Sequence, residues 1–231
     1  MKKTIIIAGA SQGIGLATAK RFLKDNSDNK IILISRESEH FKNILEELKS
    51  QYKNEIFSIF ADFSKTEDVK NAIKRILEIT DNIDILVNNA GYTKPESFLN
   101  ASIDDFRHTL EVNLISPFIL IQNFMKSGVH PKKIVNIAST SGIGARAGWI
   151  TYAISKAAMI SMSDTLREEL KVFGVDVISI SPGRCATNLR KTLAPNEDPN
   201  TIMQPENVAN TIFYLTTKEG KYLISNNLIV R

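Results

Sequence analysis

The chain alternates between short apolar runs and longer segments with apolar residues at helical spacing. Thr4–Ala8 is an uninterrupted β-branched run, the pattern of a strand that is covered on both faces of a parallel sheet. The segments between such runs carry an apolar residue every three or four positions, as an amphipathic helix does. This alternation predicts an α/β fold with a parallel, doubly wound sheet. Further strands are predicted at 31–34, 56–60, 83–87, 134–138, 175–180 and 222–230, and helices from Leu16, over 37–53, from Ser64 or Thr66, over 102–126, from Tyr152 and over 205–216.

Two segments break this regularity. In the helical region 102–126, Asn113 competes for backbone groups and Pro117 removes a helix hydrogen bond, so we predict a local kink with a polar side chain directed at a partner. Residues 188–205 are polar and rich in proline, without a clear period. Long irregular loops in compact domains are commonly functional, and we expect this one to be a substrate loop beside the site. Residues 1–231 contain no linker between two cores, which predicts one domain.

Composition narrows the class of protein. The 29 Lys and Arg against 25 Asp and Glu give a formal charge of +4, and the basic residues form no block, so we expect no nucleic-acid partner. The single cysteine, Cys185, excludes an internal disulfide and fits a reducing compartment. No stretch approaches the ~18 apolar residues of a membrane span. We therefore predict a soluble, cytoplasmic protein without a membrane partner.

A glycine-rich turn follows the first apolar run directly. Gly9, Gly13 and Gly15 stand between this run and an amphipathic segment. A strand that leads through such a turn into a helix is an anion site, because glycines let backbone N–H groups approach a pyrophosphate and the helix dipole favours its charge. The dinucleotide fingerprint is normally written with a different spacing, so a glycine-rich turn without a ligand is the alternative.

The residues after the second apolar run indicate which cofactor is bound. Ser35 and Arg36 stand where this type of fold presents groups to the adenosine ribose. A carboxylate there would accept a hydrogen bond from a free 2′-hydroxyl, whereas a hydroxyl and a guanidinium suit a 2′-phosphate. NADP is therefore predicted, with NAD as the less favoured cofactor, although Gln12 adds no second basic residue. An arginine that is merely solvated at a strand end is the alternative. Asp62 follows the third run, where a carboxylate could meet the adenine amino group.

Ser139, Tyr152 and Lys156 form a candidate proton-transfer group. Residues four apart share a helix face, so the Lys156 ammonium would lie beside the Tyr152 phenol. A neighbouring cation favours the phenolate, so the pKa of Tyr152 is predicted to fall from its usual value of about 10. Tyr152 would then serve as an acid and a base. The alternative is that Tyr152 and Lys156 form an ordinary i,i+4 pair on the protein surface.

Together these motifs resemble the short-chain dehydrogenase/reductase family over nearly the whole chain. The resemblance implies a single-domain Rossmann-type sheet of about seven strands with helices on both faces, a nicotinamide cofactor, and a homodimer or homotetramer built partly on the helices that contain Asn113 and Tyr152. The matching elements, in family order and spacing, are Gly9-x-x-x-Gly13-x-Gly15, Asp62, Asn88-Asn89-Ala90-Gly91, Asn113, Ser139, Tyr152-x-x-x-Lys156 and Pro182-Gly183-x-x-x-Thr187.

The resemblance also implies a role for each matching residue. Tyr152 would donate a proton to the developing alkoxide while Ser139 hydrogen-bonds the same oxygen. Lys156 would hydrogen-bond the nicotinamide ribose, and Asn113 would hold a water that links Lys156 to solvent. Thr187 and the backbone near Cys185 resemble a clamp for the nicotinamide carboxamide, and hydride would leave the pro-S face. The implied cofactor-binding residues are Gly9, Ser11, Gln12, Gly13, Ile14, Gly15, Ser35, Arg36, Asp62, Phe63, Asn89, Ala90, Gly91, Tyr152, Lys156, Pro182, Gly183, Cys185 and Thr187.

We therefore predict an NADP(H)-dependent oxidoreductase that interconverts a carbonyl and a secondary alcohol. A carrier-bound 3-oxoacyl thioester is the first candidate substrate, and a sugar-derived or other small ketone is the second. An NADP(H)-binding sensor or scaffold without turnover is the alternative. Trp149 either lines the substrate mouth or only packs, and Cys185 is expected in the pocket wall or buried. The scattered histidines, His40, His108 and His130, show no metal spacing.

Two departures from the family pattern affect the predicted substrate site. The family often ends in a strand followed by Asp-Gly-Gly, whereas this sequence ends Asn227-Leu-Ile-Val-Arg231. We therefore assign no residues of this sequence to the C-terminal part of the substrate wall or to one tetramer contact that is common in the family. The segment after Thr187 is also brief, so we expect a small or open lid.

Overall fold

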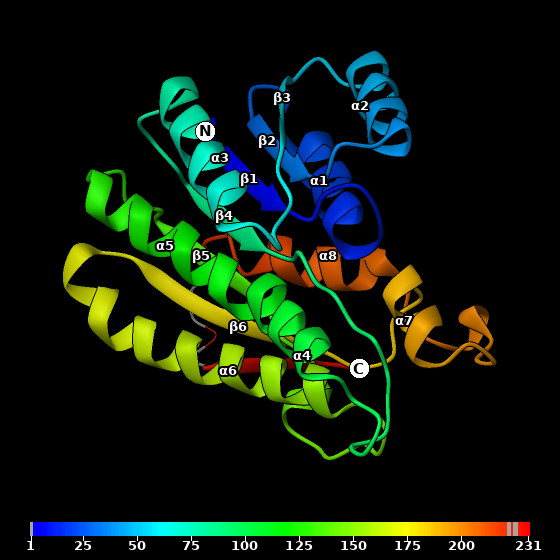
Figure 1. The fold of residues 1–231 in the computed structure, drawn as a ribbon. Coiled ribbons are helices and arrows are strands. Elements are labelled where there is room, and N and C mark those ends of the chain that lie inside the picture. The colour runs from blue at the N-terminus through cyan, green and yellow to red at the C-terminus, as the bar shows by residue number, and fades with distance from the viewer. Residues whose placement is uncertain (1, 221–222, 224–225) are drawn as a thin grey trace.

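Seven parallel strands form one sheet in the computed structural model, which describes residues 2–220, 223 and 226–231 (Figure 1). The strand order is β3-β2-β1-β4-β5-β6-β7. The chain starts at the centre, moves outward to β3, crosses back to β4 and then moves outward to β7. This confirms the predicted doubly wound α/β fold. The strands are β1 (Thr4–Ala8), β2 (Lys30–Ser35), β3 (Glu55–Phe60), β4 (Ile85–Asn88), β5 (Lys133–Ile137), β6 (Asp176–Pro182) and β7 (Asn227–Val230).

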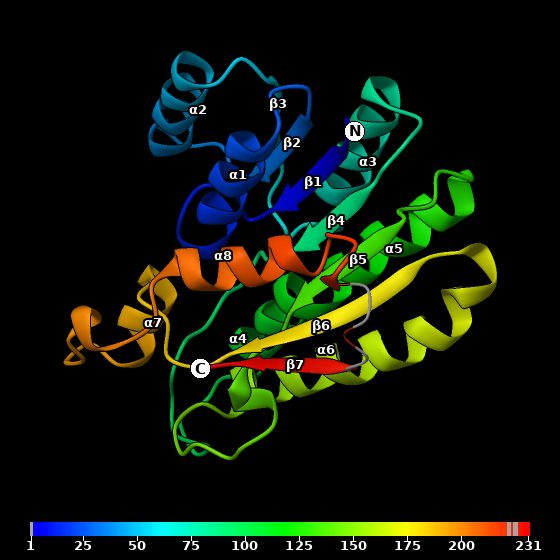
Figure 2. The same cartoon turned by 180° about the vertical axis from the view of Figure 1, so that it is seen from behind.

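Helices cover both faces of the sheet (Figures 1 and 2). The alternation of side chains along β1 sends Ile5 and Ile7 into the core on one face and Ile6 and Ala8 into the core on the other. None of the helices within the described residues is long and apolar enough to cross a bilayer. One face carries α1 (Gly13–Asp25), α2 (Glu39–Gln51) and α8 (Pro205–Tyr214), and the other carries α3 (Thr66–Ile79), α4 (Ile103–Leu110), α5 (Ser116–Ser127) and α6 (Ile150–Leu170).

The ends of several elements differ from the prediction. The last strand begins at Asn227, and of the predicted span 222–230, residues 222 and 224–225 lie outside the described residues. Neither Ser64 nor Thr66 caps α3. The Ser64 hydroxyl donates to Asp62 Oδ1 at 2.8 Å and the Thr66 hydroxyl donates to Glu111 Oε1 at 3.0 Å, so both hydroxyls are engaged elsewhere.

The predicted kink in 102–126 is a π-helical turn at Glu111–Ile115 between α4 and α5. In a π turn the backbone hydrogen bonds join residues five apart instead of four apart. This change accommodates Pro117, which has no N–H to donate. Asn113 lies inside this turn and is fully buried. Its side chain is directed at a partner, as predicted, and the partner is described with the site below.

The segment 188–205 is not wholly irregular, which corrects the prediction. It contains α7 (Asn188–Leu193) and a 3-10 turn at Pro199–Thr201. The Thr187 hydroxyl caps α7 by accepting from the Arg190 N–H at 3.1 Å. Both pieces are shorter than two turns, so they leave no visible period in the sequence.

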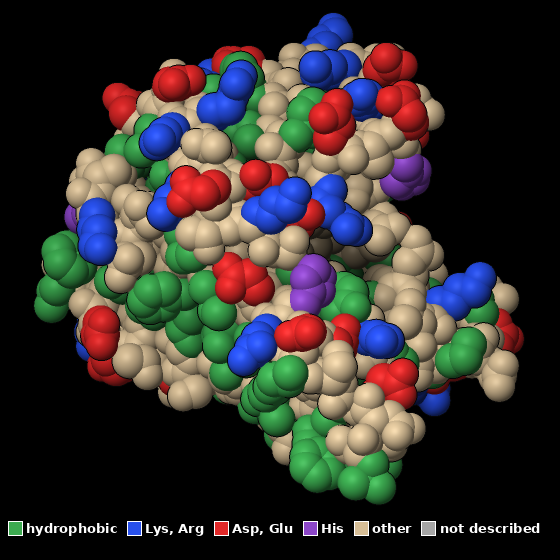
Figure 3. Space-filling view, in the orientation of Figure 1, with side chains coloured by type: hydrophobic (Ala, Val, Ile, Leu, Met, Phe, Trp, Pro, Cys, Tyr) green, Lys and Arg blue, Asp and Glu red, His purple; other side chains and the backbone are tan. Residues whose placement is uncertain are grey.

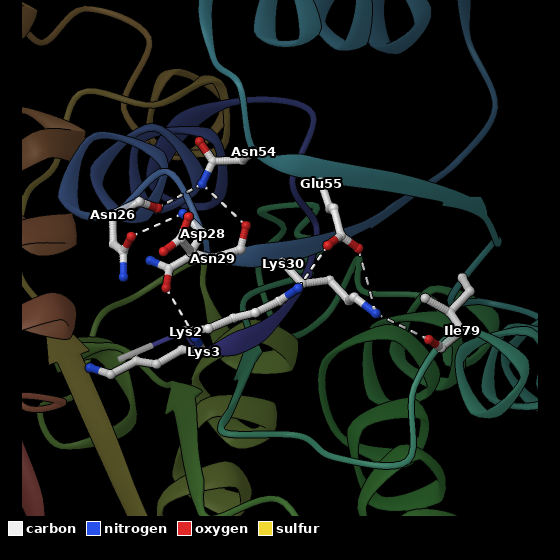
Figure 4. A network of polar contacts seen from close by, with 9 residues as sticks. All are labelled: Lys2, Lys3, Asn26, Asp28, Asn29, Lys30, Asn54, Glu55 and Ile79. Atoms are coloured by element: carbon white, nitrogen blue, oxygen red, sulfur yellow. Dashed lines mark hydrogen bonds and ion pairs between the residues drawn. The ribbon is translucent and has the colours of Figure 1, made fainter.

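Lysine side chains cover carbonyl groups at the amino end of the sheet. Lys30 Nζ donates to the Ile79 carbonyl at the end of α3 at 3.3 Å and lies 3.7 Å from the Glu55 carboxylate (Figure 4). Lys133 Nζ donates to the Leu215 carbonyl, just after α8, at 2.7 Å. A cation at a helix C-terminus satisfies orphan carbonyls and opposes the negative end of the dipole. These lysines therefore stabilise the end of the sheet opposite to the cavity described next.

Candidate active site

A cavity of about 240 Å³ opens at the carboxyl ends of the strands. Its lining includes the ends of β1 and β4, where the order of the sheet reverses, the position at which open α/β sheets bind ligands. Figure 3 shows the surface hollowed on this side, with Lys and Arg side chains around the hollow. Of the predicted site residues, all line this cavity except Gly15 and Asn113.

The glycine turn forms one wall of the cavity. Gly9 has φ +77° and a Cβ on it would lie 2.6 Å from Ala90 Cα, so only glycine fits. No side chain caps the start of α1 and no acidic residue lies in its first turn. The first N–H groups of α1 are therefore free of side-chain partners, as a phosphate site requires. These residues fit the pyrophosphate of a dinucleotide.

Gly15 has a packing role instead of a cavity-facing one. A Cβ on Gly15 would lie 2.1 Å from the Gly9 carbonyl oxygen and 2.6 Å from Asn89 Nδ2. Asn89 Nδ2 also donates to the Gly9 carbonyl at 2.8 Å. The end of β4 and the start of α1 thus hold the glycine turn in shape.

Ser35, Arg36, Asp62 and Phe63 gather at one end of the cavity. Burial acts to raise the pKa of Asp62, but hydrogen bonds from Ser64 and the charges of Arg36 and Lys65 outweigh it and hold the pKa below its ordinary value. The Asp62 carboxylate is therefore ionised near the Arg36 guanidinium.

Tyr152 is buried where α6 borders the cavity. Burial raises the pKa of Tyr152 to about 12, while a hydrogen bond with Ser139 and the charge of Arg190 act in the opposite direction. The predicted fall of this pKa is wrong in this structure. Loss of water around the phenolate outweighs the nearby charges.

Lys156 follows Tyr152 by one turn of α6, yet its amine does not bond the phenol. Lys156 Nζ donates to the Ile137 carbonyl at 2.7 Å and lies 5.7 Å from the centre of the Tyr152 ring. Burial lowers the pKa of Lys156 to about 8. The amine is thus a buried cation at neutral pH, held by a backbone carbonyl beside the tyrosine.

Asn113 lies behind the cavity wall and joins two elements that form the site. Its Oδ1 accepts from the Tyr92 N–H at 2.7 Å, and its Nδ2 donates to the Tyr92 carbonyl at 2.9 Å and to Ser155 Oγ at 2.9 Å. Both amide hydrogens are therefore used within the protein. A water held at Asn113 cannot receive a hydrogen bond from this side chain without breaking one of these contacts.

The segment after β6 forms the opposite wall. Pro182, Gly183, Cys185 and Thr187 line the cavity. Burial, and to a lesser degree the charge of Glu206, raise the pKa of the Cys185 thiol to about 11. The thiol therefore stays protonated, and Cys185 is a buried residue of the pocket wall, as the sequence predicts.

The cavity also contains arginines that no sequence motif marks. Arg146, Arg184 and Arg190 line it, together with His108 and Trp149. Trp149 was open to two interpretations, and the structure places it at the cavity. Arg146 lies in the loop before α6, far in sequence from Arg184, just after β6, and Arg190 in α7, so only the fold brings this loop to the other two arginines.

Comparison with known proteins identifies the family. The family model described as short chain dehydrogenase matches residues 3–198. The chain belongs to the short-chain dehydrogenase family. Like the family, it is an oxidoreductase that interconverts a carbonyl and an alcohol with a nicotinamide cofactor.

Several short-chain dehydrogenases match along nearly their whole length. The 3-oxoacyl-[acyl-carrier-protein] reductase FabG of Aquifex aeolicus (strain VF5) is 29% identical over 231 residues, covering 96% of this chain and 92% of the relative. A crystal structure of a short chain dehydrogenase from Burkholderia cenocepacia J2315 in complex with NADP is 26% identical, with a TM-score of 0.87 and coverage of 99% and 96%. The structure of 4-hydroxyisoleucine dehydrogenase complexed with NADH is 27% identical, with a TM-score of 0.84 and the same coverage.

Proposed function

We propose that this short-chain dehydrogenase is an NADP(H)-dependent carbonyl reductase in which Ser139, Tyr152 and Lys156 perform the proton transfer. The observation that carries the proposal is the buried Tyr152 phenol, which lines the cavity together with Ser139, with Lys156 one helical turn further along α6. The same site would oxidise the alcohol in the reverse direction.

Hydride transfer is the chemistry that a nicotinamide cofactor supplies when bound. Tyr152 donates its proton to the alkoxide that develops on the substrate, and Ser139 stabilises the same oxygen by a hydrogen bond. With a pKa of about 12 the phenol holds its proton at neutral pH, as an acid must. Lys156 is charged below its pKa of about 8, and this charge favours the phenolate that remains.

The residues around the cavity support binding of the cofactor in an extended form. The glycine turn and the start of α1 would hold the pyrophosphate, and Asp62 would accept from the adenine amino group. Arg36 suits a 2′-phosphate, which supports NADP over NAD. Thr187 and the backbone at Cys185 would face the carboxamide. Asn113 is a positioning residue, because its side chain contacts Tyr92 and Ser155 rather than the cavity.

For the substrate, we propose a small or carrier-bound carbonyl compound. The names of curated relatives support testing 3-oxoacyl thioesters first, and sugar-derived ketones second. The segment 188–205, with α7, would form the substrate wall, since Leu189, Arg190 and Leu193 line the cavity. We also propose a homodimer or homotetramer that pairs through the outer faces of α4, α5 and α6.

Substitution of Tyr152 by Phe tests this assignment. Loss of the proton donor is expected to lower kcat for NADPH-dependent reduction by about 10²- to 10⁴-fold. The affinity for NADPH, measured by fluorescence titration, should change little, because the ring remains. Tyr214→Phe is a matched control, since Tyr214 is half exposed at the end of α8. Full turnover by the Tyr152→Phe protein would show that Tyr152 is not the acid.

A further inference from the structure

The part of the cavity next to Tyr152 is lined by cationic and aromatic side chains outside the family motifs. Arg146, Trp149 and Arg190 lie there. Trp149 directly precedes α6 and stands three residues before Tyr152. One helical turn rises only about 5 Å, so Trp149 lies close to the residue that carries the reacting phenol.

Two guanidinium groups lie against the single indole ring. Arg146 Cζ is 5.4 Å and Arg190 Cζ is 5.5 Å from the centre of the Trp149 ring. Both distances fall within the range of a cation–π contact. A guanidinium held on an aromatic ring keeps its N–H groups available for a planar acceptor such as a carboxylate.

The positive charges here outnumber the carboxylates. Arg190 Nη2 donates to Glu197 Oε1 at 2.7 Å, and Arg184 lies 3.4 Å from the same oxygen. Over the described part of the chain, Arg146 forms no ion pair with a carboxylate. Glu197 thus pairs directly with Arg190 and Arg184, while the charge of Arg146 acts on the same carboxylate without an ion-pair contact, so three guanidinium groups share one carboxylate.

The loop that carries Arg146 is attached to the body of the protein at both ends. The Glu96 N–H donates to the Gly148 carbonyl at 2.8 Å. Gly142 packs so closely on α6 that a Cβ there would lie 2.6 Å from the carbonyl carbon of Lys156. These contacts fix the backbone on both sides of Arg146, whose exposed side chain lies beside the cavity.

We propose that Arg146, Trp149 and Arg190 form a subsite for a carboxylate of the substrate, so that the enzyme prefers small oxo acids and the matching hydroxy acids over neutral ketones. Arg146 binds the carboxylate directly, while Arg190, held by Glu197, adds positive charge. A carboxylate bound beside Trp149 lies about one helical turn from the Tyr152 phenol, which faces the reacting carbonyl. The carboxylate and the carbonyl are therefore only a few bonds apart in one small molecule. This inference rests on the proposed function, since it places the carbonyl at Tyr152.

Kinetics on matched substrates test the subsite. The probes are 4-oxopentanoate and its uncharged methyl ester, each with NADPH. We expect wild type to favour the acid by at least about tenfold in kcat/KM, and Arg146→Gln to reduce this acid-to-ester ratio by about 10- to 100-fold, mainly through KM, because a charged hydrogen bond is lost. Arg75→Gln, an exposed residue on α3, makes the same change in net charge and should keep the ratio.

Fluorescence provides a second measurement that needs no turnover. Trp149 is the only tryptophan in the chain, so its emission reports on the subsite. Titration with 4-oxopentanoate should give a saturable change in wild type and Arg75→Gln, and the change should require far higher concentrations in Arg146→Gln. The methyl ester should bind weakly to all three proteins.

Equal binding of the acid by wild type and Arg146→Gln, or equal use of acid and ester by wild type, would overturn the subsite. Either result leaves the proposed carbonyl reduction intact, since that is judged by the Tyr152→Phe protein on any ketone that wild type reduces. NADPH affinity and the melting temperature of Arg146→Gln are measured as well. If a lower NADPH affinity or a lower melting temperature of Arg146→Gln accounts for its lost preference for the acid over the ester, this would also count against a carboxylate site.

Discussion

Burial shifts the ionisation of Tyr152 and Lys156 in opposite directions, and in both cases it favours the uncharged form. The pKa of Tyr152 rises to about 12 and that of Lys156 falls to about 8. The protein thus keeps a buried lysine at a cost in stability, because the amine is still protonated at neutral pH. Such a cost is typical of functional sites, where a group is retained for its chemistry.

Lys156→Met is expected to stabilise the protein at neutral pH while abolishing its activity. Below pH 8 the lysine is charged in both the folded and the unfolded state, so the burial penalty is complete. The pKa of Lys156 falls from 10.5 to about 8, and each pH unit of this shift corresponds to ~1.4 kcal/mol. Lys156→Met should therefore raise the free energy of unfolding by up to about 3 kcal/mol, less the contribution of the lost hydrogen bond to Ile137.

The pH dependence of this gain follows from the lowered pKa. Between pH 8 and 10.5 the folded protein releases the Lys156 proton before the unfolded chain does, so wild type gains stability as the pH rises. The advantage of Lys156→Met should therefore shrink from pH 7 to pH 10 in urea unfolding. Lys74→Met, at an exposed site on α3, serves as the control. An advantage that is independent of pH would contradict the explanation.

Arg36→Asp is expected to reverse the choice of cofactor. The guanidinium that suits a 2′-phosphate would be replaced by a carboxylate that repels it and accepts from a free 2′-hydroxyl. Titration of both proteins with NADPH and NADH should show tighter NADPH binding by wild type and tighter NADH binding by Arg36→Asp, with NADPH affinity reduced by about tenfold or more. Equal affinity of wild type for both cofactors would defeat the argument from Arg36.

At the scale of elements, the π turn between α4 and α5 connects the loop after β4 to α6. Asn113 forms this connection with one accepted and two donated hydrogen bonds, all within the protein. Ser155, which it contacts, directly precedes Lys156 on α6. The turn therefore controls where the lysine and tyrosine lie relative to the cavity.

Asn113→Ala should lower the free energy of unfolding by about 2–4 kcal/mol, because part-buried backbone groups of Tyr92 and the buried Ser155 hydroxyl lose their partners. Asn123→Ala is the matched control: the Asn123 side chain donates to a carbonyl of its own helix, Ile119, at 2.8 Å, and its loss should cost under about 1 kcal/mol. Urea unfolding measures both. A similar small cost at the two positions would show that the Asn113 contacts contribute little.

At the scale of the whole molecule, apolar side chains remain exposed on the outer faces of α4 to α6. Ile103 is 58% exposed, Phe118 is 44% and Ile154 is 43%. A contiguous exposed apolar surface is typical of protein–protein interfaces. These residues support the proposed assembly through this face.

Phe118→Glu is expected to convert the assembly to monomers, because a carboxylate on each copy would be buried against an apolar surface. Size-exclusion chromatography with light scattering measures the mass. Tyr214→Glu, on the opposite side of the sheet, should leave the mass of wild type unchanged. A monomeric wild type, or an unchanged mass for Phe118→Glu, would contradict this interface.

The features determined by the sequence alone depend on short spacings. Alternating apolar periods predicted the doubly wound sheet, and the glycines at 9 and 13 predicted a tight turn, in which both have a positive φ, because strand pattern and glycine conformation are local properties of the backbone. The spacing of Tyr152 and Lys156 placed both on one helix. The short helix α7 was missed, since six residues are too few to show a helical period.

Only the tertiary structure decided how these groups are surrounded. Desolvation by the packed core raises the pKa of Tyr152 against the nearby charges, and the Lys156 amine donates to the Ile137 carbonyl at the end of β5. Asn113 finds its partners across the fold, and Arg146 and Arg190 meet at Trp149 from separate elements. Burial and charge depend on contacts between residues distant in sequence, and no local spacing encodes them.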